Sequence, residues 1–523
     1  MSDNLVSVQD DTSLHGTFVG YAKLNRKATA TLVLRPKQQD EELRQELDDL
    51  LYKHPVTRNY LNHEKLAEST SFDKNDEEVI KAYLTEYNLS HFEVNAISRE
   101  LTFSGKVRDL QKAFNSPIGI FHGADHLEYK CATQAIRVPE TIGELLYSFK
   151  GFYFRPKKET RKITPIEKYD DQSWGRGFSI SDICSAYNIP EDVKGAGQCI
   201  GLVELGGRHR ETDIKKFFKL INTPVPKIKI VGTDPGKDSD INNGEVSMDL
   251  QIAGAIAPEA TLVIYYASTF IEALKLIIND VENNPSVISI SWSAPEQYYQ
   301  PVEKLEFDQL LYQAALLGIT VIGSSGDHGA YNGQKTPNVP LPASHPLVLG
   351  CGGTIINIEE GERVAEMAWN EFNGGEATGG GYSNYYGTPQ YQAQAISKYP
   401  YQKEGGRGVP DVAALSSTID GFQVIQDKQK VVVGGTSTAT PMWAALIALM
   451  NEKLGYNLGF CNHLFYELAG TKSFNQIVNG NNLLYKAAQY WNPCTGLGSP
   501  SGDDLLENIQ KNEPNSDLET DKN

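Results

Sequence analysis

A serine on a glycine-rich turn is the strongest chemical feature of this 523-residue sequence. Ser437 lies in the segment GGTSTATP, residues 434–441, and the pattern that follows predicts a helix over residues 442–454. We expect a serine at such a helix start to be exposed, beside backbone N–H groups that can stabilise developing negative charge. Serine and threonine also cap helices. The two glycines before the serine and the proline after it favour a nucleophile.

A serine nucleophile needs a base within hydrogen-bond reach, and histidine is the usual choice. Among ten histidines, His328 is the only well-placed one, because it follows Asp327 at the end of an expected strand. His15 begins a His-Gly-Thr triplet that superficially resembles the histidine motif of subtilisin. We interpret that triplet as accidental, because it lies in a polar N-terminal segment outside the α/β region.

Two carboxylates offer another base. Glu245 and Asp249 are four residues apart at the start of a helix expected over residues 246–256, so they stack on one helix face. Like charges at that spacing are unfavourable unless they share a proton or serve a purpose. The face continues into apolar residues, so we expect the pair at the edge of the core. The alternative is a solvated acidic turn.

Asp327 is a third carboxylate with a suggestive position. It follows an apolar strand expected over residues 319–324, in the loop GSSGDHG, residues 323–329. Ligands of parallel sheets bind beyond the carboxyl ends of the strands. The alternative interpretation is an Asx turn.

The elements that must position these side chains alternate between strand and helix from about residue 175. This alternation predicts a parallel sheet covered by helices on both faces. The expected strands are residues 199–205, 261–266, 287–291, 319–324 and 347–350. The expected helices are residues 211–220, 246–256, 269–282 and 302–317.

The N-terminal part has a different pattern and predicts a small α+β module. Its expected strands are residues 28–34, 92–97, 100–104, 118–122 and 127–131. Its expected helices are residues 41–53, 75–87 and 107–114, with one further element at 140–148 and a loose segment over 1–18. We therefore divide the chain into a module of residues 1–154, a basic linker of 155–177, a catalytic domain of 178–512 and a disordered tail of 513–523. The linker is either a plain exposed connection or a processing site.

Composition excludes several classes of protein. The chain has 48 basic and 66 acidic residues and a net charge of −18, which argues against nucleic acid or an anionic membrane as partner. No apolar run reaches the roughly 18–20 residues that cross a bilayer. The six cysteines are too few for a disulfide scaffold, and none forms a CxxC pair. The first residues show no secretory signal pattern.

Taken together, these fragments resemble one family, the sedolisins or serine-carboxyl peptidases, and within it the kumamolisin-like proenzymes. The matching fragments, in order, are residues 203–207 (VELGG), 244–249 (GEVSMD), 289–292 (SISW), 326–327 (GD), 351–354 (CGGT), 378–381 (TGGG), 407–411 (RGVPD), 435–441 (GTSTATP) and 493–498 (PCTGLG). Each fragment alone is weak, but the ordered set is specific. The first 150 or so residues resemble the family's prodomain, including residues 113–114 (AF) and 138–140 (VPE).

The resemblance implies a subtilisin-like sheet preceded by a ferredoxin-like prodomain, and it implies roles for the residues. Ser437 would be the nucleophile and Glu245 its general base, with Asp249 supporting the base. Asp327 would line the oxyanion hole. Glu204 and Trp292 match outer members of the family's hydrogen-bond network. A carboxylate base and a protonated oxyanion-hole carboxyl both favour acidic conditions.

The resemblance also implies a calcium site that this sequence has altered. In relatives two aspartates and three backbone carbonyls hold the ion near the C-terminus. Here the aspartates are replaced by Gln476 and Asn492, and the carbonyl positions are Ile477, Ala488 and Tyr490. Calcium prefers ionised carboxylates. We therefore expect no calcium and no other cofactor, with the two amides closing the loop by hydrogen bonds.

The leading hypothesis is an acid-active endopeptidase made as a proenzyme that processes itself. Its partners would be protein or peptide substrates and its own prodomain as an intramolecular inhibitor, and the enzyme would be a monomer. The family favours an extracellular or otherwise acidic location. Two alternatives remain: a non-catalytic binding protein with this fold, and a His-dependent subtilisin-type protease.

Overall fold

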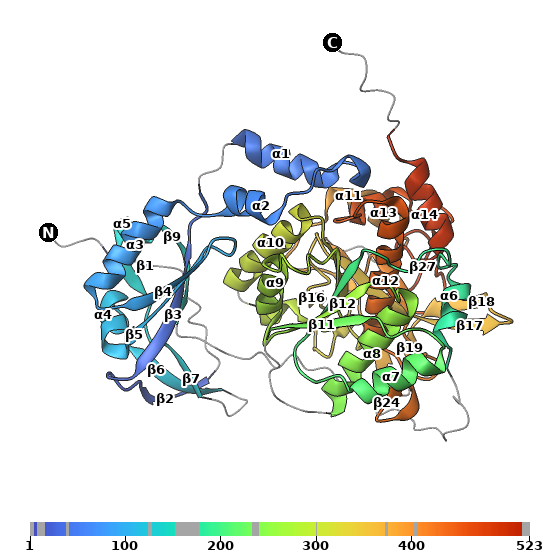
Figure 1. The fold of residues 1–523 in the computed structure, drawn as a ribbon, viewed down its shortest axis with the longest axis horizontal. Coiled ribbons are helices and arrows are strands. Elements are labelled where there is room, and N and C mark those ends of the chain that lie inside the picture. Colours follow the sequence, from blue (N-terminus) through green and yellow to red (C-terminus); the bar gives the residue numbers. More distant parts are fainter. Residues whose placement is uncertain are drawn as a thin grey trace, which may run out of the picture. The chain divides into compact units, whose positions relative to one another are not determined.

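The computed structural model describes residues 5–7, 16–37, 41–123, 128–151, 177–232, 240–299, 301–371, 375–401 and 405–514. These residues form two compact units. The first unit contains residues 1–47, 61–157 and 300–313, and the second contains residues 48–60, 158–299 and 314–523. Figure 1 shows the ribbon coloured along the sequence. His15 and residues 155–176 of the linker lie outside the described residues, as do residues 515–523 of the tail.

An eight-stranded sheet forms the centre of the second unit (Figure 1). Its strands follow the order β11-β12-β10-β13-β15-β17, and β17 also pairs with β18 and β23. All neighbours are parallel except β17 and β18. The strands are β10 (Cys199–Glu204), β11 (Lys227–Gly232), β12 (Thr261–Tyr266), β13 (Val287–Ile290), β15 (Thr320–Ser324), β17 (Leu349–Glu359), β18 (Glu362–Ala368) and β23 (Val412–Leu415). The predicted parallel sheet is confirmed, although β11, β18 and β23 were not expected.

Helices flank this sheet. Helix α12 packs against β10, β13, β15, β17 and β23 and against α8, while α9 packs on β10 and β12. The helices of this unit are α6 (Ile180–Ala186), α7 (Glu211–Leu220), α8 (Asp240–Ile256), α9 (Phe270–Ile278), α11 (Gln390–Ser397), α12 (Thr436–Leu454), α13 (Asn462–Glu467) and α14 (Gly502–Lys511). Most of α10 (Pro301–Leu316) belongs to the first unit, which includes residues 300–313. Short strands complete the unit: β14 (Ala294–Pro295), β16 (Pro340–Leu341), β19 (Asn370–Glu371), β20 (Glu376–Ala377), β21 (Gly381–Tyr382), β22 (Gly408–Val409), β24 (Phe422–Gln426), β25 (Gln429–Val433), β26 (Phe474–Asn475) and β27 (Ser499–Pro500).

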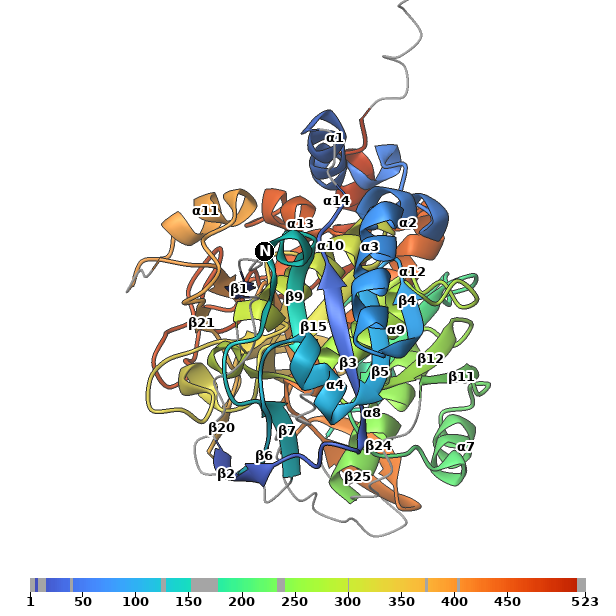
Figure 2. The same cartoon turned by 90° about the vertical axis from the view of Figure 1, so that its left-hand side faces the viewer.

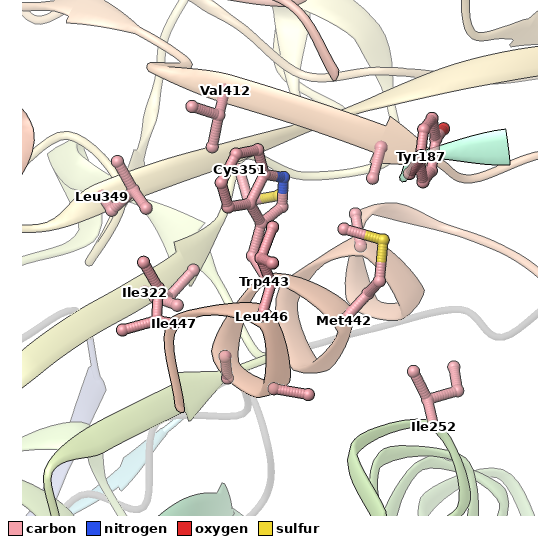
Figure 3. Packing of buried hydrophobic residues seen from close by; sticks show 14 of the residues in the cluster. Tyr187, Ile252, Ile322, Leu349, Cys351, Val412, Met442, Trp443, Leu446 and Ile447 are labelled. Atoms are coloured by element: carbon pink, nitrogen blue, oxygen red, sulfur yellow. The ribbon is translucent and has the colours of Figure 1, made fainter. Parts of the chain in front are cut away.

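Helix α12 is buried on nearly all sides, which explains its apolar sequence. Figure 3 shows Trp443 of α12 beside Cys351 of β17 and near Val412 of β23. The indole Nε1 of Trp443 donates a hydrogen bond to the carbonyl of Ala413, 3.0 Å away, so burial leaves its N–H satisfied. This packing fixes the helix start that carries Ser437.

The RGVPD motif is a structural feature of the same core. Arg407 and Asp411 are fully buried and paired with each other. Asp411 also accepts a hydrogen bond from the backbone N–H of Gly350 in β17, at 2.7 Å. Through this hydrogen bond the pair joins the segment before β23 to the neighbouring strand. Removing either partner would leave a buried charge uncompensated.

The first unit contains a four-stranded antiparallel sheet with the order β4-β5-β3-β9 (Figure 2). In chain order its strands and helices follow a β-α-β-β-α-β pattern, which is the ferredoxin-like arrangement. The elements are β3 (Lys27–Leu34), α1 (Glu41–Tyr52), α2 (His63–Thr70), α3 (Lys74–Glu86), β4 (Ser90–Asn95), β5 (Glu100–Lys106), α4 (Val107–Ala113), α5 (Glu140–Gly143) and β9 (Leu146–Gly151). The remaining strands are β1 (Leu5–Ser7), β2 (Gly16–Tyr21), β6 (Ile118–Gly123), β7 (Glu128–Ala132) and β8 (Arg137–Pro139).

Two predictions for this module are wrong. The segment 140–148 divides into the short helix α5 and the start of β9, and β9 pairs with β3. Part of the segment expected to be loose forms β1 and β2, which pair with β8 and β6. These short strands form by pairing with distant parts of the chain, and a local sequence pattern does not contain that information.

Two further observations concern the described residues as a whole. No helix among them combines the length and the apolar character needed to cross a bilayer. All six cysteines are described, and all are free thiols.

Candidate active site

Ser437 is the second residue of α12, which begins at Thr436. The turn before it requires glycine. Gly435 has a φ of 96°, and a Cβ on Gly434 would lie 2.2 Å from the carbonyl oxygen of Ser417. The two glycines therefore allow the chain to pass β23 closely and enter the helix at once.

The Ser437 hydroxyl does not cap the helix. It donates a hydrogen bond to the backbone carbonyl of Ser291, 3.1 Å away. The N-cap residue is Gly435, which has no side chain. The prediction of an exposed serine is wrong in degree, because only 1% of Ser437 is accessible. It nevertheless lines a cleft, so a substrate can reach it.

Glu245 and Asp249 lie inside α8, because the helix begins at Asp240 rather than near residue 246. Both side chains are fully buried, so the expectation of a pair at the edge of the core is wrong, as is the alternative of a solvated turn. The Oδ2 atom of Asp249 accepts a hydrogen bond from Ser291 Oγ at 2.7 Å. The same hydroxyl lies 3.3 Å from the carbonyl oxygen of Ser437. Ser291 thus connects Asp249 of α8 to the start of α12.

Asp327 lies beside the residue that precedes the nucleophile. Its Oδ1 atom accepts hydrogen bonds from the backbone N–H and from the hydroxyl of Thr436, both at 2.7 Å. The Gly326 N–H also donates to the Thr436 hydroxyl, at 3.2 Å. These partners are about a hundred residues away in the sequence, which favours a site residue over an Asx turn.

Glu204 and Trp292 contact each other, as the resemblance implied. Trp292 Nε1 donates a hydrogen bond to Glu204 Oε2 at 3.0 Å, and both residues are buried. Glu204 ends β10 and Trp292 follows β13, the neighbouring parallel strand. The pair therefore lies at the carboxyl edge of the sheet, where Asp327 follows β15.

The cleft at this edge has a volume of about 570 Å³. Ser437, Thr436, Asp327 and His328 line it together with Ser291. Sequence reasoning did not single out Ser291 or Thr436. Both lie within fragments that match the family, SISW and GTSTATP, but the sequence does not show which side chains they contact.

The altered calcium loop does not fit a calcium ion. Asn492 is buried, and its Nδ2 donates to the carbonyls of Ile477 (3.3 Å) and Ala488 (2.9 Å). These are two of the carbonyls that would face the ion. The Oε1 atom of Gln476 accepts from the Tyr490 N–H at 3.1 Å. The Asn492 amide N–H group thus makes the contacts to these carbonyls that a calcium ion would otherwise make. Among the described residues no cluster of three or more His, Cys, Asp or Glu could hold a metal.

Comparisons with known proteins show which family this chain is similar to. A family model described as the pro-kumamolisin activation domain matches residues 15–148, and a subtilase family model matches residues 231–461. The chain is 32% identical to kumamolisin of Bacillus sp. (strain MN-32) over 509 residues, which is 92% of each protein. It is 26% identical to sedolisin of Pseudomonas sp. (strain 101) over 442 residues, 76% of this chain and 73% of that one.

Two more similarities are informative. Tripeptidyl-peptidase 1 of Dictyostelium discoideum is 30% identical over 307 residues, covering 52% of this chain and 48% of that protein. The solved structure of Pseudomonas sedolisin complexed with two molecules of pseudo-iodotyrostatin superposes with a TM-score of 0.58 at 26% identity. That match covers 65% of this chain and 99% of the other.

Proposed function

Because the chain belongs to the sedolisin family of serine-carboxyl peptidases, with a kumamolisin-type activation domain, we propose that it is an acid-active endopeptidase made as a proenzyme. The observation that carries the proposal is the connection of Ser437 to Asp249 through Ser291, with Asp327 held beside the nucleophile by Thr436. A nucleophile, buried carboxylates and a carboxyl at the oxyanion position are the groups that acyl transfer requires.

The reaction follows from these groups. The Ser437 hydroxyl turns from the Ser291 carbonyl toward Glu245, which takes its proton while Oγ attacks the carbonyl carbon of the peptide bond. The peptide oxygen becomes an oxyanion, and a protonated Asp327 donates a hydrogen bond to it. Glu245 then gives the proton to the leaving amine, so the C–N bond breaks and an acyl-enzyme remains. A water molecule, deprotonated by Glu245, releases the acyl group and restores Ser437.

The supporting residues keep Glu245 able to exchange protons. Asp249 lies one helical turn further along α8, and a neighbouring carboxyl group allows one proton to be held between two acids. Glu204 and Trp292 extend the network to β10. We assign them a positioning role, because Trp292 Nε1 bonds to Glu204 and neither lines the cleft.

The N-terminal module would act as intramolecular inhibitor and would be removed by self-processing. The calcium site of the family would be absent here, with the Asn492 amide taking the place of the ion. Tripeptidyl exopeptidase activity is the second candidate function, because several similar proteins bear the name tripeptidyl-peptidase 1. A non-catalytic relative would not need Ser437, Glu245, Asp249 and Asp327 together.

Hydrolysis of an internally quenched peptide at about pH 4 tests the proposal. One peptide has an acetylated N-terminus and a central cleavable bond, and a matched peptide has a free amine. We expect the acid-incubated protein to cleave the acetylated peptide, and Ser437→Ala to lose at least about 10⁴-fold in rate. Cleavage only of the free peptide, three residues from its end, would favour the exopeptidase. Equal turnover by pure, folded Ser437→Ala would refute the assignment.

A further inference from the structure

The cleft beside Ser437 contains an unusual set of hydrogen-bond donors. Besides Asp327, its only ionisable lining side chains among the described residues are His328 and Tyr298. Asn332 and Gln334 add two amides to the wall. The cleft lies entirely within the second unit, between the segment after β13 and the loop after β15.

The cleft lies on the acyl side of the bond to be cleaved, provided that the proposed function holds. Asp327 marks where the oxygen of the scissile carbonyl would lie. The general base returns its proton to the leaving amine, so the leaving group lies on the side of the base. Glu245 is buried and does not line the cleft. The side chain just before the cleaved bond, the P1 side chain, would therefore enter the cleft.

One wall of the cleft is already held by its own hydrogen bonds. Gln334 Nε2 donates to the hydroxyl of Tyr298 at 2.6 Å, and Gln297 Nε2 donates to Gln334 Oε1 at 3.2 Å. The amide of Gln334 is thus occupied on both atoms. The Tyr298 hydroxyl accepts one hydrogen bond here and keeps its own proton for a ligand.

Two other donors in the cleft are not engaged by the described residues. The Nδ2 atom of Asn332 is buried and has no hydrogen-bond partner among them. Asn332 is held in a left-handed conformation with a φ of 45°, and its amide lies against Gly326. The His328 imidazole is half-buried and makes no hydrogen bond to the described part of the chain. A buried donor without a partner is costly, so a ligand that accepts from it gains binding energy.

We propose that this cleft selects an acidic P1 side chain, glutamate in the first place. The imidazole of His328, the Asn332 amide and the Tyr298 hydroxyl would donate to its carboxylate. A glutamate side chain ionises above about pH 4.3, so in mild acid its carboxylate can accept these hydrogen bonds.

Other charged groups near His328 bear on this pH range. Its backbone pairs with Ala377 in β20, next to Glu376, whose carboxylate accepts a hydrogen bond from Thr418 at 3.0 Å. The ionisable groups on the surrounding segments are Asp327, Tyr298, Tyr331, Lys335 and Glu376. Lys335 is exposed and does not line the cleft, which makes it a matched control for removal of a positive charge.

The test compares four peptides that differ only at P1, with Glu, Gln, Leu or Lys, cleaved by the acid-incubated full chain. The glutamate preference is the kcat/KM for the Glu peptide divided by that for the Gln peptide. We expect it to be about fivefold or more at about pH 5 and to approach one near pH 3, where the substrate carboxyl is protonated. The Lys peptide should be the poorest substrate.

Variants assign the preference to the cleft. His328→Gln should lower the glutamate preference at about pH 5 to roughly one, and Asn332→Ala should lower it in part. Lys335→Gln should keep the preference and its dependence on pH. An unchanged preference in His328→Gln, or equal rates for Glu and Gln at every pH, would overturn the proposal while leaving the peptidase assignment intact. Failure to cleave any peptide would instead overturn the proposed function as well.

Discussion

The Ser437 hydroxyl donates to the carbonyl of Ser291 in this structure, so the nucleophile rests on a hydrogen bond that catalysis must break. Ser291 also donates to Asp249 from the same position. The start of α12 is thereby tied to α8 through a residue of the segment after β13. Small changes at Ser291 or Asp249 would therefore shift the nucleophile and its base relative to each other, and acyl transfer is sensitive to such shifts.

At this scale we predict that Glu245→Gln and Asp249→Asn each reduce kcat by about 10²–10⁴-fold, because an amide cannot accept or share the serine proton. His328→Ala should reduce the turnover of a peptide with a neutral P1 residue by about tenfold at most. The measurement is kcat and KM of purified, folded variants at about pH 4. An essential His328 together with a dispensable Glu245 would instead establish a histidine-dependent protease.

The sequence indicates which residues are candidates for the site, but it does not predict how buried they are. Ser437, Glu245, Asp249 and Asp327 stand in recognisable fragments, so the sequence alone suggests them as candidate site residues. Their burial was not predictable in the same way. Helix α8 begins at Asp240, and a pattern of apolar residues beginning at Val246 does not reveal that start.

At the scale of elements, the loop around Asn492 shows how one side chain replaces an ion. The Asn492 Oδ1 atom accepts hydrogen bonds from the N–H groups of Cys494 and Thr495, both at 3.0 Å. Its Nδ2 atom donates to carbonyls on the other side of the loop. A single amide thus satisfies donors and acceptors together, which a carboxylate could do only with a cation.

We predict that the wild-type protein has no tight calcium site and that the double substitution Gln476→Asp and Asn492→Asp creates one. Two carboxylates facing the same carbonyls require a cation, and affinity follows ligand charge. Calorimetric titration after chelator treatment measures this, together with the melting temperature. Without calcium the double variant should melt at a lower temperature than wild type, and calcium should restore part of the loss.

The double variant has a clear control. Asn482 is also a buried asparagine, but its Nδ2 donates to the carbonyls of Gly380 and Pro493, so Asn482→Asp tests a buried charge elsewhere. It should lower the melting temperature with no response to calcium. A micromolar calcium site in the wild type, lost on changing Gln476 and Asn492 to alanine, would show that the amides coordinate the ion.

The sheet was easier to predict than the loops and the N-terminal strands. The strands β10, β12, β13 and β15 are short apolar runs, and such runs predict strands that are buried in a parallel sheet. By contrast, β11 is partly exposed and contains two lysines, so its pairing with β12 was missed. In the N-terminal module β1 and β2 depend on distant partners for the same reason.

At the scale of the whole molecule, an N-terminal segment belongs to the second unit. Arg58 is buried there and donates to the carbonyls of Leu458 and Phe460, at 3.0 and 2.8 Å. Its Nη2 atom lies 3.1 Å from Nε2 of His463. Because a guanidinium only donates, this ring nitrogen must be the acceptor and unprotonated. Burial, reinforced by Arg58 and His54, lowers the pKa of His463 to about 3.

The low pKa makes this contact sensitive to acid. In the unfolded chain a histidine has a pKa of about 6.5, so between about pH 6.5 and 3 the unfolded state binds more protons than the folded state. Stability therefore falls as the pH falls through this range. We predict that His463→Gln flattens the dependence of stability on pH, because glutamine can accept from Arg58 and does not titrate.

Chemical denaturation from pH 7 to 4 measures this difference in free energy of unfolding. Both proteins should contain Ser437→Ala, which prevents self-cleavage during the measurement. His122→Gln controls for the loss of a histidine elsewhere in the chain. His122 lies near the end of β6 in the first unit, whereas Arg58 and His463 belong to the second unit. Parallel pH profiles for the His463→Gln and unsubstituted proteins would contradict the account of this contact.

Self-processing is a further prediction for the whole chain. Incubation of the full-length protein at about pH 4 should cut it between residues 155 and 177, because a basic linker with a proline and no apolar pattern is a good protease substrate. N-terminal sequencing over time locates the cut. A Ser437→Ala precursor cut at the same place and rate, with no other protease present, would exclude self-processing.

The central claim is that a carboxylate, and not a histidine, activates Ser437. The most direct measurement is the rate and site of covalent labelling by a peptidyl fluorophosphonate, read by mass spectrometry at about pH 4 and about pH 8. The account predicts a single adduct on Ser437 that forms faster in acid, is nearly lost in Glu245→Gln and persists in His328→Ala. Labelling that survives Glu245→Gln and disappears in His328→Ala would contradict it.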